Sequence, residues 1–158
     1  MAARRKRSKK RSAASSGPRP NPITVFVDEC LARFAVPEAL KTAGATVVVH
    51  HELFQPGTED SVWLAALAEH PDWLVLTKDR QIQRRPLEQQ AYLNARLRVF
   101  ALTSANLTGE EQAAAFVRAL PKIRRLAQRR GPFIAKVTAG GVVQVVASRP
   151  TPRAKPPR

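Results

Sequence analysis

Short apolar runs alternate with longer amphipathic stretches through the middle of the chain. Four runs are rich in β-branched or aromatic residues and are bounded by polar or glycine positions, which is typical of buried strands: residues 23–27, 45–49, 73–77 and 97–102. Strands that alternate with helices form parallel sheets covered on both faces. The pattern therefore predicts an α/β fold with three layers, α/β/α, around a mainly parallel central sheet.

The stretches between these runs have the periodicity and end signals of helices. We expect helices over residues 31–43 (broken at Pro37), 58–70 (capped by Thr58), 86–95 (with Pro86 in the first turn) and 108–129. The last of them opens with a capping box, Thr108-Gly-Glu-Glu111. Two further runs, 133–137 and 142–146, flank Gly140-Gly141 and predict a C-terminal β-hairpin.

Charge divides the 158-residue chain into a body and two tails. The formal net charge is +15, yet residues 1–22 hold eight Lys or Arg and residues 149–158 hold four, with no acid in either segment. We expect both segments to be disordered and basic, with one domain over residues 23–148. The tails either keep the protein in solution or bind a polyanion such as nucleic acid.

Several classes of protein are disfavoured by composition. The single cysteine, Cys30, excludes a disulfide framework and a cysteine-rich zinc site, and we expect it to be a buried structural thiol. No run of 18 apolar residues occurs, and no glycine-rich phosphate loop is present. These features, with a start that lacks an apolar signal stretch, predict a cytoplasmic protein with no membrane span.

Carboxylates occupy the positions where ligands bind in parallel sheets. Asp28 and Asp79 each follow a predicted strand, and Asp60 lies in the first turn of the helix predicted over residues 58–70, three residues before Trp63. Taken singly, each of these acids has an ordinary alternative as a turn residue or helix cap. Right-handed winding brings the three to one corner, where their repulsion requires a cation, and oxygen ligands favour Mg²⁺ or Mn²⁺.

Other polar residues follow the second and fourth strands. His50 and His51 are adjacent, so their side chains would point to opposite faces, and we interpret them as loop histidines rather than zinc ligands. Asn106 follows the fourth strand and is able to ligate a metal or to shape the turn before the long helix.

Taken in order, the motifs resemble a known family. They are Val25-Phe-Val-Asp-Glu29, Leu40-Lys-Thr-Ala-Gly44, Val47-Val-Val-His50, Gly57-Thr-Glu-Asp60-Ser-Val-Trp63 and Trp73-Leu-Val-Leu-Thr-Lys-Asp79. The body is similar to the PIN-like domain, and most similar to its small VapC-like toxin branch. That resemblance implies an Mg²⁺- or Mn²⁺-dependent endoribonuclease, the toxin of a toxin–antitoxin pair, with RNA as substrate and a cognate antitoxin protein as partner.

The resemblance also assigns residues. Asp28, Asp60 and Asp79 match the acidic catalytic and metal-binding core, and Glu29 matches the second acid of an Asp-Glu pair. Members of the family often have a fourth acid late in the chain, and Asn106 stands at the corresponding place, so its side chain adds an oxygen ligand but no charge.

Basic residues near these acids are candidates for RNA contact. Arg80, Arg84 and Arg85 follow Asp79 directly. A stripe on the last predicted helix has spacings of 4, 3 and 4: Arg118, Lys122, Arg125 and Arg129. The alternative for this stripe is a solvated helix face.

Two other functions stay open from the sequence. The chain is either a nuclease or a non-catalytic PIN-like module that binds RNA or a protein partner. A weaker alternative is a receiver-like domain that accepts a phosphoryl group, with Lys136 as its lysine. RNA cleavage that depends on a divalent cation separates the first from the others.

Overall fold

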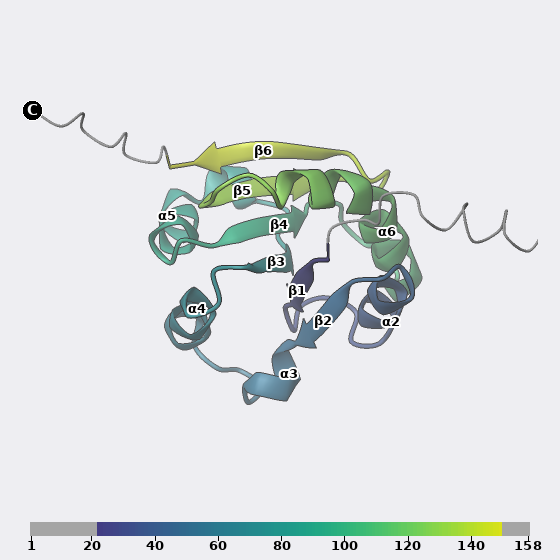
Figure 1. Ribbon diagram of the computed structural model, residues 1–158, viewed down its shortest axis with the longest axis horizontal. Coiled ribbons are helices and arrows are strands. Elements are labelled where there is room, and N and C mark those ends of the chain that lie inside the picture. Colours follow the sequence, from purple (N-terminus) through teal and green to yellow (C-terminus); the bar gives the residue numbers. More distant parts are fainter. Residues whose placement is uncertain (1–21, 150–158) are drawn as a thin grey trace, which may run out of the picture.

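A computed structural model describes residues 22–149 and shows one six-stranded sheet with helices on both faces (Figure 1). The strands are β1 (Thr24–Val27), β2 (Thr46–Val49), β3 (Trp73–Lys78), β4 (Arg98–Leu102), β5 (Phe133–Val137) and β6 (Val143–Ser148). Their order is β2-β1-β3-β4-β5-β6, and all neighbours are parallel except β5 and β6. The predicted three-layer fold and C-terminal hairpin are confirmed. The predicted basic tails lie outside the described residues, apart from their innermost members, Pro22 and Arg149.

Helices cover the two faces in pairs. They are α2 (Ala35–Thr42), α3 (His50–Leu53), α4 (Asp60–Ala68), the 3₁₀ turn η2 (Ile82–Arg84), α5 (Pro86–Asn94) and α6 (Gly109–Leu126). Helices α2 and α6 pack on one face around Phe100 and Phe116, whereas α4 and α5 pack on the other around Phe26 and Trp63 (Figure 1). Each face therefore has its own apolar core, and the strand side chains alternate between the two.

The strand order creates a crevice next to β1. From β1 the chain crosses through α2 to β2 on one side, and returns over α4 to β3 on the other side. The direction of winding thus changes between β1 and β3. In open parallel sheets, ligands bind outside the carboxyl ends of the strands at such a switch point.

The first two helices differ from the sequence prediction. Helix α2 starts at Ala35, so Pro37 lies in its first turn, where a missing N–H costs little, and does not break it. Helix α4 spans only Asp60–Ala68, and Thr58 is not its cap. The Thr58 hydroxyl instead donates to the Gln55 carbonyl at 2.5 Å, which closes the turn before the helix.

The second strand and the last helix also differ in detail. We expected residues 45–49 to form a buried strand, but β2 is at the edge of the sheet, with Thr46 exposed and Val47 and Val48 half-buried. Helix α6 begins with the predicted capping box, in which Thr108 accepts from the Glu111 N–H at 3.1 Å. It ends at Leu126, before the predicted end at residue 129. No helix among residues 22–149 has the length and apolar character that a membrane crossing requires.

Candidate active site at the carboxyl ends of β1 and β3

Asp28 and Asp79 stand at the ends of the two strands that border the crevice. Each continues the ladder of its own strand for one more hydrogen bond: the Asp28 N–H donates to Leu76 O and the Asp79 N–H to Leu102 O, both at 3.0 Å. The sequence prediction that these two acids end neighbouring strands at one edge is therefore confirmed. Their backbone is fixed by the sheet, so their side chains start from rigid positions.

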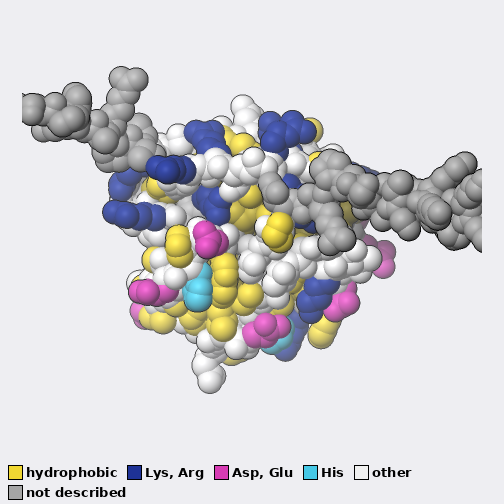
Figure 2. Space-filling model, viewed as in Figure 1, with side chains coloured by type: hydrophobic (Ala, Val, Ile, Leu, Met, Phe, Trp, Pro, Cys, Tyr) yellow, Lys and Arg dark blue, Asp and Glu magenta, His cyan; other side chains and the backbone are white. Residues whose placement is uncertain are grey.

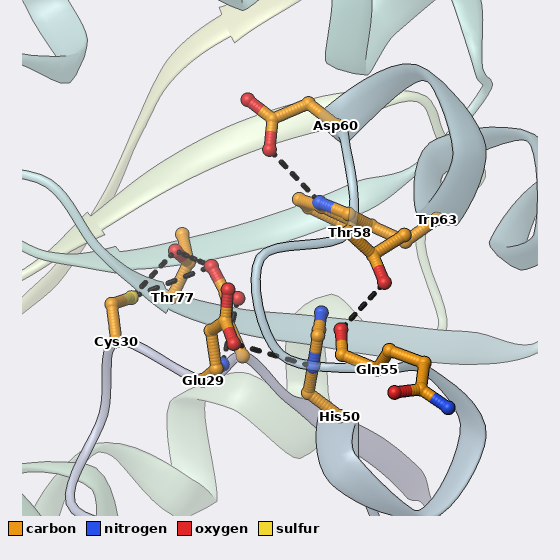
Figure 3. Close-up of polar contacts among 9 residues, drawn as sticks. Glu29, Cys30, His50, Gln55, Thr58, Asp60, Trp63 and Thr77 are labelled. Atoms are coloured by element: carbon orange, nitrogen blue, oxygen red, sulfur yellow. Dashed lines mark hydrogen bonds and ion pairs between the residues drawn. The ribbon is translucent and has the colours of Figure 1, made fainter.

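The Asp28 carboxylate is held by three donors. Thr77 Oγ1 donates to Asp28 Oδ2 at 2.8 Å, the Glu29 N–H donates to Oδ1 at 2.7 Å, and Cys30 Sγ lies 3.4 Å from Oδ2 (Figure 3). Thr77 is buried on β3, so this contact ties the end of β1 to its neighbour. Hydrogen bonds to an ionised carboxylate are stronger than neutral ones and orient it.

Cys30 differs from the expected buried structural thiol. The residue is exposed, but its sulfur faces Asp28 and also lies 3.4 Å from Thr77 Oγ1. Desolvation of the thiol, followed by the negative charge of Asp28, raises the pKa of Cys30 to about 11. The sulfur is therefore a neutral thiol at physiological pH and acts as a weak donor to the carboxylate.

Asp79 has one oxygen that is satisfied and one that is not. Its Oδ1 accepts from the Gln81 N–H at 2.8 Å, whereas its Oδ2 is buried and has no hydrogen-bond partner within the described part of the chain. The residue lines a hollow of about 420 Å³ together with Cys30, Lys78, Arg80, Gln81, Arg85 and Glu88. A buried carboxylate oxygen without a partner is costly, which marks this hollow as a place for a ligand.

Glu88 is a member of the site that sequence analysis missed. It lies in the first turn of α5, lines the same hollow as Asp79, and pairs with Arg85 at 3.3 Å. Burial, followed by the charge of Asp79, raises the pKa of Glu88. An acid in a first helical turn is ordinary because the helix dipole favours it, so the position carried no signal of its own. Glu88 is nine residues from Asp79 in sequence, and the two reach the same hollow only because η2 folds the chain back between them.

Asp60 begins α4 and is not on the lining of the hollow of Asp79. Its Oδ1 accepts from the buried Trp63 indole N–H at 2.9 Å, which confirms that the two side chains share a helix face (Figure 3). Buried Tyr92 of α5 connects Asp60 to the other acids. Burial raises the pKa of Tyr92, and the negative charges of four carboxylates raise it further: Glu88, Asp28, Asp60 and Asp79. One phenol thus lies within electrostatic range of all four.

The acids do not form a preassembled cage. Among residues 22–149, no group of three His, Cys, Asp or Glu side chains is arranged to hold a metal ion. Glu29 faces His50, because its Oε2 lies 3.7 Å from Nδ1 of that residue (Figure 3). The metal-ligand roles of Asp28, Asp60, Asp79 and Glu29 stay predictions.

The two histidines are not loop residues. Both belong to the short helix α3, where His50 is buried against Phe54, at 5.3 Å between ring centroids, and His51 is exposed. Asn106 has a left-handed backbone with φ of 57° and an exposed side chain, a conformation that Asn tolerates in turns. No contact of its side chain with the acids is present, and its predicted role as a metal ligand stays a prediction.

The candidate RNA-binding residues fall into two groups. Arg80 and Arg85 line the hollow with Asp79, and Arg84 is exposed on η2. The second group, Arg118, Lys122, Arg125 and Arg129, is exposed on or just beyond α6, which starts at the acidic edge and runs toward the opposite edge of the sheet. On the face seen in Figure 2, basic side chains gather toward β6 and α5, and acidic ones lie nearer α3 and α4.

Comparison with known proteins agrees with this architecture. The family profile described as "PIN like domain" matches residues 23–104, just over half of the chain. The chain belongs to the PIN-like domain family. A curated member is 32% identical over 126 residues, covering 77% of this chain and 91% of its own length, and is described as "Putative ribonuclease VapC45" of Mycobacterium tuberculosis. No solved structure matches this PIN-like chain significantly.

Proposed function

We propose that this PIN-like protein is a metal-dependent endoribonuclease that hydrolyses RNA phosphodiesters. One observation carries the proposal: Asp79 Oδ2 is buried without a hydrogen-bond partner among residues 22–149, in a hollow that Glu88 also lines, and Asp28 ends the neighbouring strand beside it. Arginines on the rim of that hollow supply the complementary charge for a phosphate backbone. The description of the curated relative as a ribonuclease supports the same activity.

The residues fit a hard divalent cation. Burial, and then the negative charge of Asp79, raises the pKa of Glu88, and Asp79 Oδ2 lies at the same hollow with no hydrogen-bond partner among residues 22–149. Both features are relieved by Mg²⁺ or Mn²⁺, which bind carboxylate oxygens. We assign Asp28 and Asp79 as the principal ligands, with Asp60 and Glu88 as further candidate ligands. When bound, the cation supplies Lewis acidity and lowers the pKa of a water.

The surrounding residues orient the metal ligands and bind the substrate, and they take no part in the chemical step. Thr77 and the Glu29 N–H orient the Asp28 carboxylate at the end of β1. Arg80 and Arg85 hold the phosphates on either side of the bond to be cut, because guanidinium groups bind phosphate oxygens in pairs. The indole N–H of Trp63 donates to Asp60 and so fixes this side chain at the first turn of α4.

The biological role that fits is that of a toxin with a cognate antitoxin protein. This rests on the relative, whose name assigns it to the VapC group, and on the match over most of both chains. Under this proposal the antitoxin blocks the crevice until RNA cleavage is needed.

The test is an RNA cleavage assay on the full chain with Mn²⁺ or Mg²⁺. We expect cleavage to stop in chelator and to fall by more than about 100-fold in Asp28→Asn and Asp79→Asn, since loss of a ligand exceeds the cost of losing its outer support. Glu69→Gln, an exposed acid at the other end of α4, serves as the matched control and should cleave normally. RNA binding in chelator should survive in all variants. Metal-independent cleavage, or full activity in Asp79→Asn, would contradict the proposal.

A further inference from the structure

A second hollow lies beside the acids. Of its lining, the proposed chemistry uses the Asp28 carboxylate and the Glu29 N–H, but not the side chain of Glu29. The hollow is about 190 Å³ in volume and opens where β1 and β2 end. Sites that enclose a whole small ligand usually measure roughly 300–1,000 Å³. This hollow is therefore large enough for one ring system of a larger molecule, and the rest of that molecule would lie outside it.

The walls and the rim of the hollow differ in chemistry. Its walls are aliphatic and come from Val27, Leu31, Val49 and Pro56. Its polar lining includes Glu29 and His50, whose side chains point toward each other (Figure 3). Proteins bind a base that is taken out of its stack between aromatic or apolar side chains and read its Watson–Crick edge with polar groups. Aliphatic walls with a polar rim offer this combination.

His50 is the second sign of a missing ligand. The residue is only 1% exposed, and neither Nδ1 nor Nε2 has a hydrogen-bond partner among the described residues. Nδ1 lies 3.7 Å from Glu29 Oε2, so a proton on Nδ1 points at that carboxylate from just beyond hydrogen-bond distance. His50 is thus placed to position Glu29 without touching the ligand itself.

The carboxylate of Glu29 selects the kind of base. It is 44% exposed, it only accepts hydrogen bonds, and its two oxygens match two adjacent N–H donors. Among RNA bases, the Watson–Crick edge of guanine offers two adjacent N–H groups. Adenine and cytosine offer one amine beside a bare acceptor, and uracil flanks its single N–H with carbonyl oxygens that a carboxylate repels. The donor pattern therefore favours guanine.

We propose that this hollow binds a guanine base of the RNA, read by Glu29 and adjacent to the bond that is cut. The inference rests on the proposed function for its substrate. Asp28 connects the two sites, because it lines this hollow while its carboxylate contacts Cys30, which lines the hollow of Asp79. A base seated here places its own phosphate at the acidic crevice. Arg33, exposed and also on the lining, faces the backbone on the other side.

Binding is measured without metal, so that it does not depend on cleavage. The probes are four RNA pentanucleotides that have identical adenosine flanks and carry G, A, C or U at the central position. Each is added, in the presence of chelator, to full-length protein that contains isotope-labelled histidine. We expect the central-G RNA to bind about tenfold more tightly than the central-U RNA and to move the His50 ring signals in the NMR spectrum. Equal binding of all four RNAs, or an unmoved His50 signal, would overturn the proposal.

Variants separate this inference from the proposed function. Glu29→Gln should lose the preference for G, whereas Glu52→Gln, an exposed acid on α3 outside the hollow, should keep it. Asp79→Asn should also keep the preference for G while losing cleavage. Metal-dependent cleavage with no base preference would refute the guanine site alone, and a retained preference for G in a protein that never cleaves RNA would refute the nuclease alone. An unchanged preference in Glu29→Gln would overturn the role of Glu29.

Discussion

The hydroxyl of Thr77 donates to Asp28 Oδ2 at 2.8 Å and so links the ends of the two central strands. Thr77 is only 3% exposed, and its side chain is the one long-range support of this carboxylate besides the neighbouring thiol. Outer supports of this kind hold a metal ligand in one orientation.

Replacing Thr77 by Val should weaken both the metal site and the fold. The variant keeps a similar shape but loses the donor, which costs about 1.5–3 kcal/mol in the free energy of unfolding because the acceptor is charged. We expect affinity for Mn²⁺, measured by isothermal titration calorimetry, to fall about 10- to 100-fold. Thr77→Ser keeps the hydroxyl and is the control. Equal Mn²⁺ affinity in Thr77→Val and the native protein would mean that Asp28 needs no support from β3.

The raised pKa of Glu88 predicts how stability of the metal-free protein depends on pH. The folded state binds the Glu88 proton more tightly than the unfolded chain, whose ordinary pKa is near 4.5. The free energy of unfolding therefore falls as pH rises from this value to the raised pKa of the folded state, and it stays lower above it. Glu88→Gln should remove this fall, which urea titrations in chelator between about pH 4 and 8 would detect.

Added Mn²⁺ supplies the control for that measurement. A cation at the site lowers the pKa of Glu88, so the native protein with Mn²⁺ should gain stability as pH rises, which reverses the trend in chelator. If the stability of the native protein in chelator depended on pH in the same way as that of Glu88→Gln, the pKa of Glu88 would not be raised in the folded state. That result would contradict the placement of Glu88 beside Asp79.

The two groups of basic residues should contribute differently to the binding and cleavage of RNA. Arg85→Gln removes a cation from the acidic hollow, where a phosphate beside the cut bond would lie. We expect it to lower kcat/KM strongly and to reduce the slope of log affinity against log salt by about 0.7 per lost contact with single-stranded RNA. Lys122→Gln, exposed on α6, should leave the rate constant at saturating RNA unchanged. Filter binding at several salt concentrations checks both, and identical effects would mean that position relative to the crevice does not matter.

Asn106 is tested by adding a charge. If its side chain reaches the site when metal is present, Asn106→Asp supplies an anionic oxygen and should raise Mn²⁺ affinity several-fold. If it serves only the turn, Asn106→Gly should be harmless, because glycine adopts its φ of 57° without strain, and Asn106→Asp should leave Mn²⁺ affinity unchanged. Calorimetric titration of both variants distinguishes the two roles.

Much of the frame was predictable because it depends on local signals. Apolar runs locate the strands, and Thr108 with Glu111 marks the start of α6 as predicted. The positions of Asp28 and Asp79 at one edge follow from parallel pairing alone, since every parallel strand presents its carboxyl end to that edge.

The parts that could not be predicted depend on contacts distant in sequence. Glu88 joins Asp79 only through the fold of η2 and α5, and its own position looks like an ordinary helix start. The burial of His50 follows from two aromatic neighbours, Phe26 on β1 and Phe54 just after α3, which no pattern around residue 50 indicates. The edge position of β2 likewise depends on strand order, which apolar composition does not encode.

The bond from Trp63 to Asp60 has a practical consequence for anyone studying this protein. When a cation binds to a carboxylate that accepts a hydrogen bond from an indole N–H, the fluorescence emission of that indole changes. The indole of Trp63 donates to Asp60 in this way, and because it is only 3% exposed it is shielded from bulk water. The only other tryptophan, Trp73, stacks on His70 with 3.8 Å between ring centroids, and Trp73→Phe removes its emission. The chain thus carries its own optical probe at the acidic edge, and the arrival of a metal or an RNA phosphate there can be followed in real time without attaching a dye.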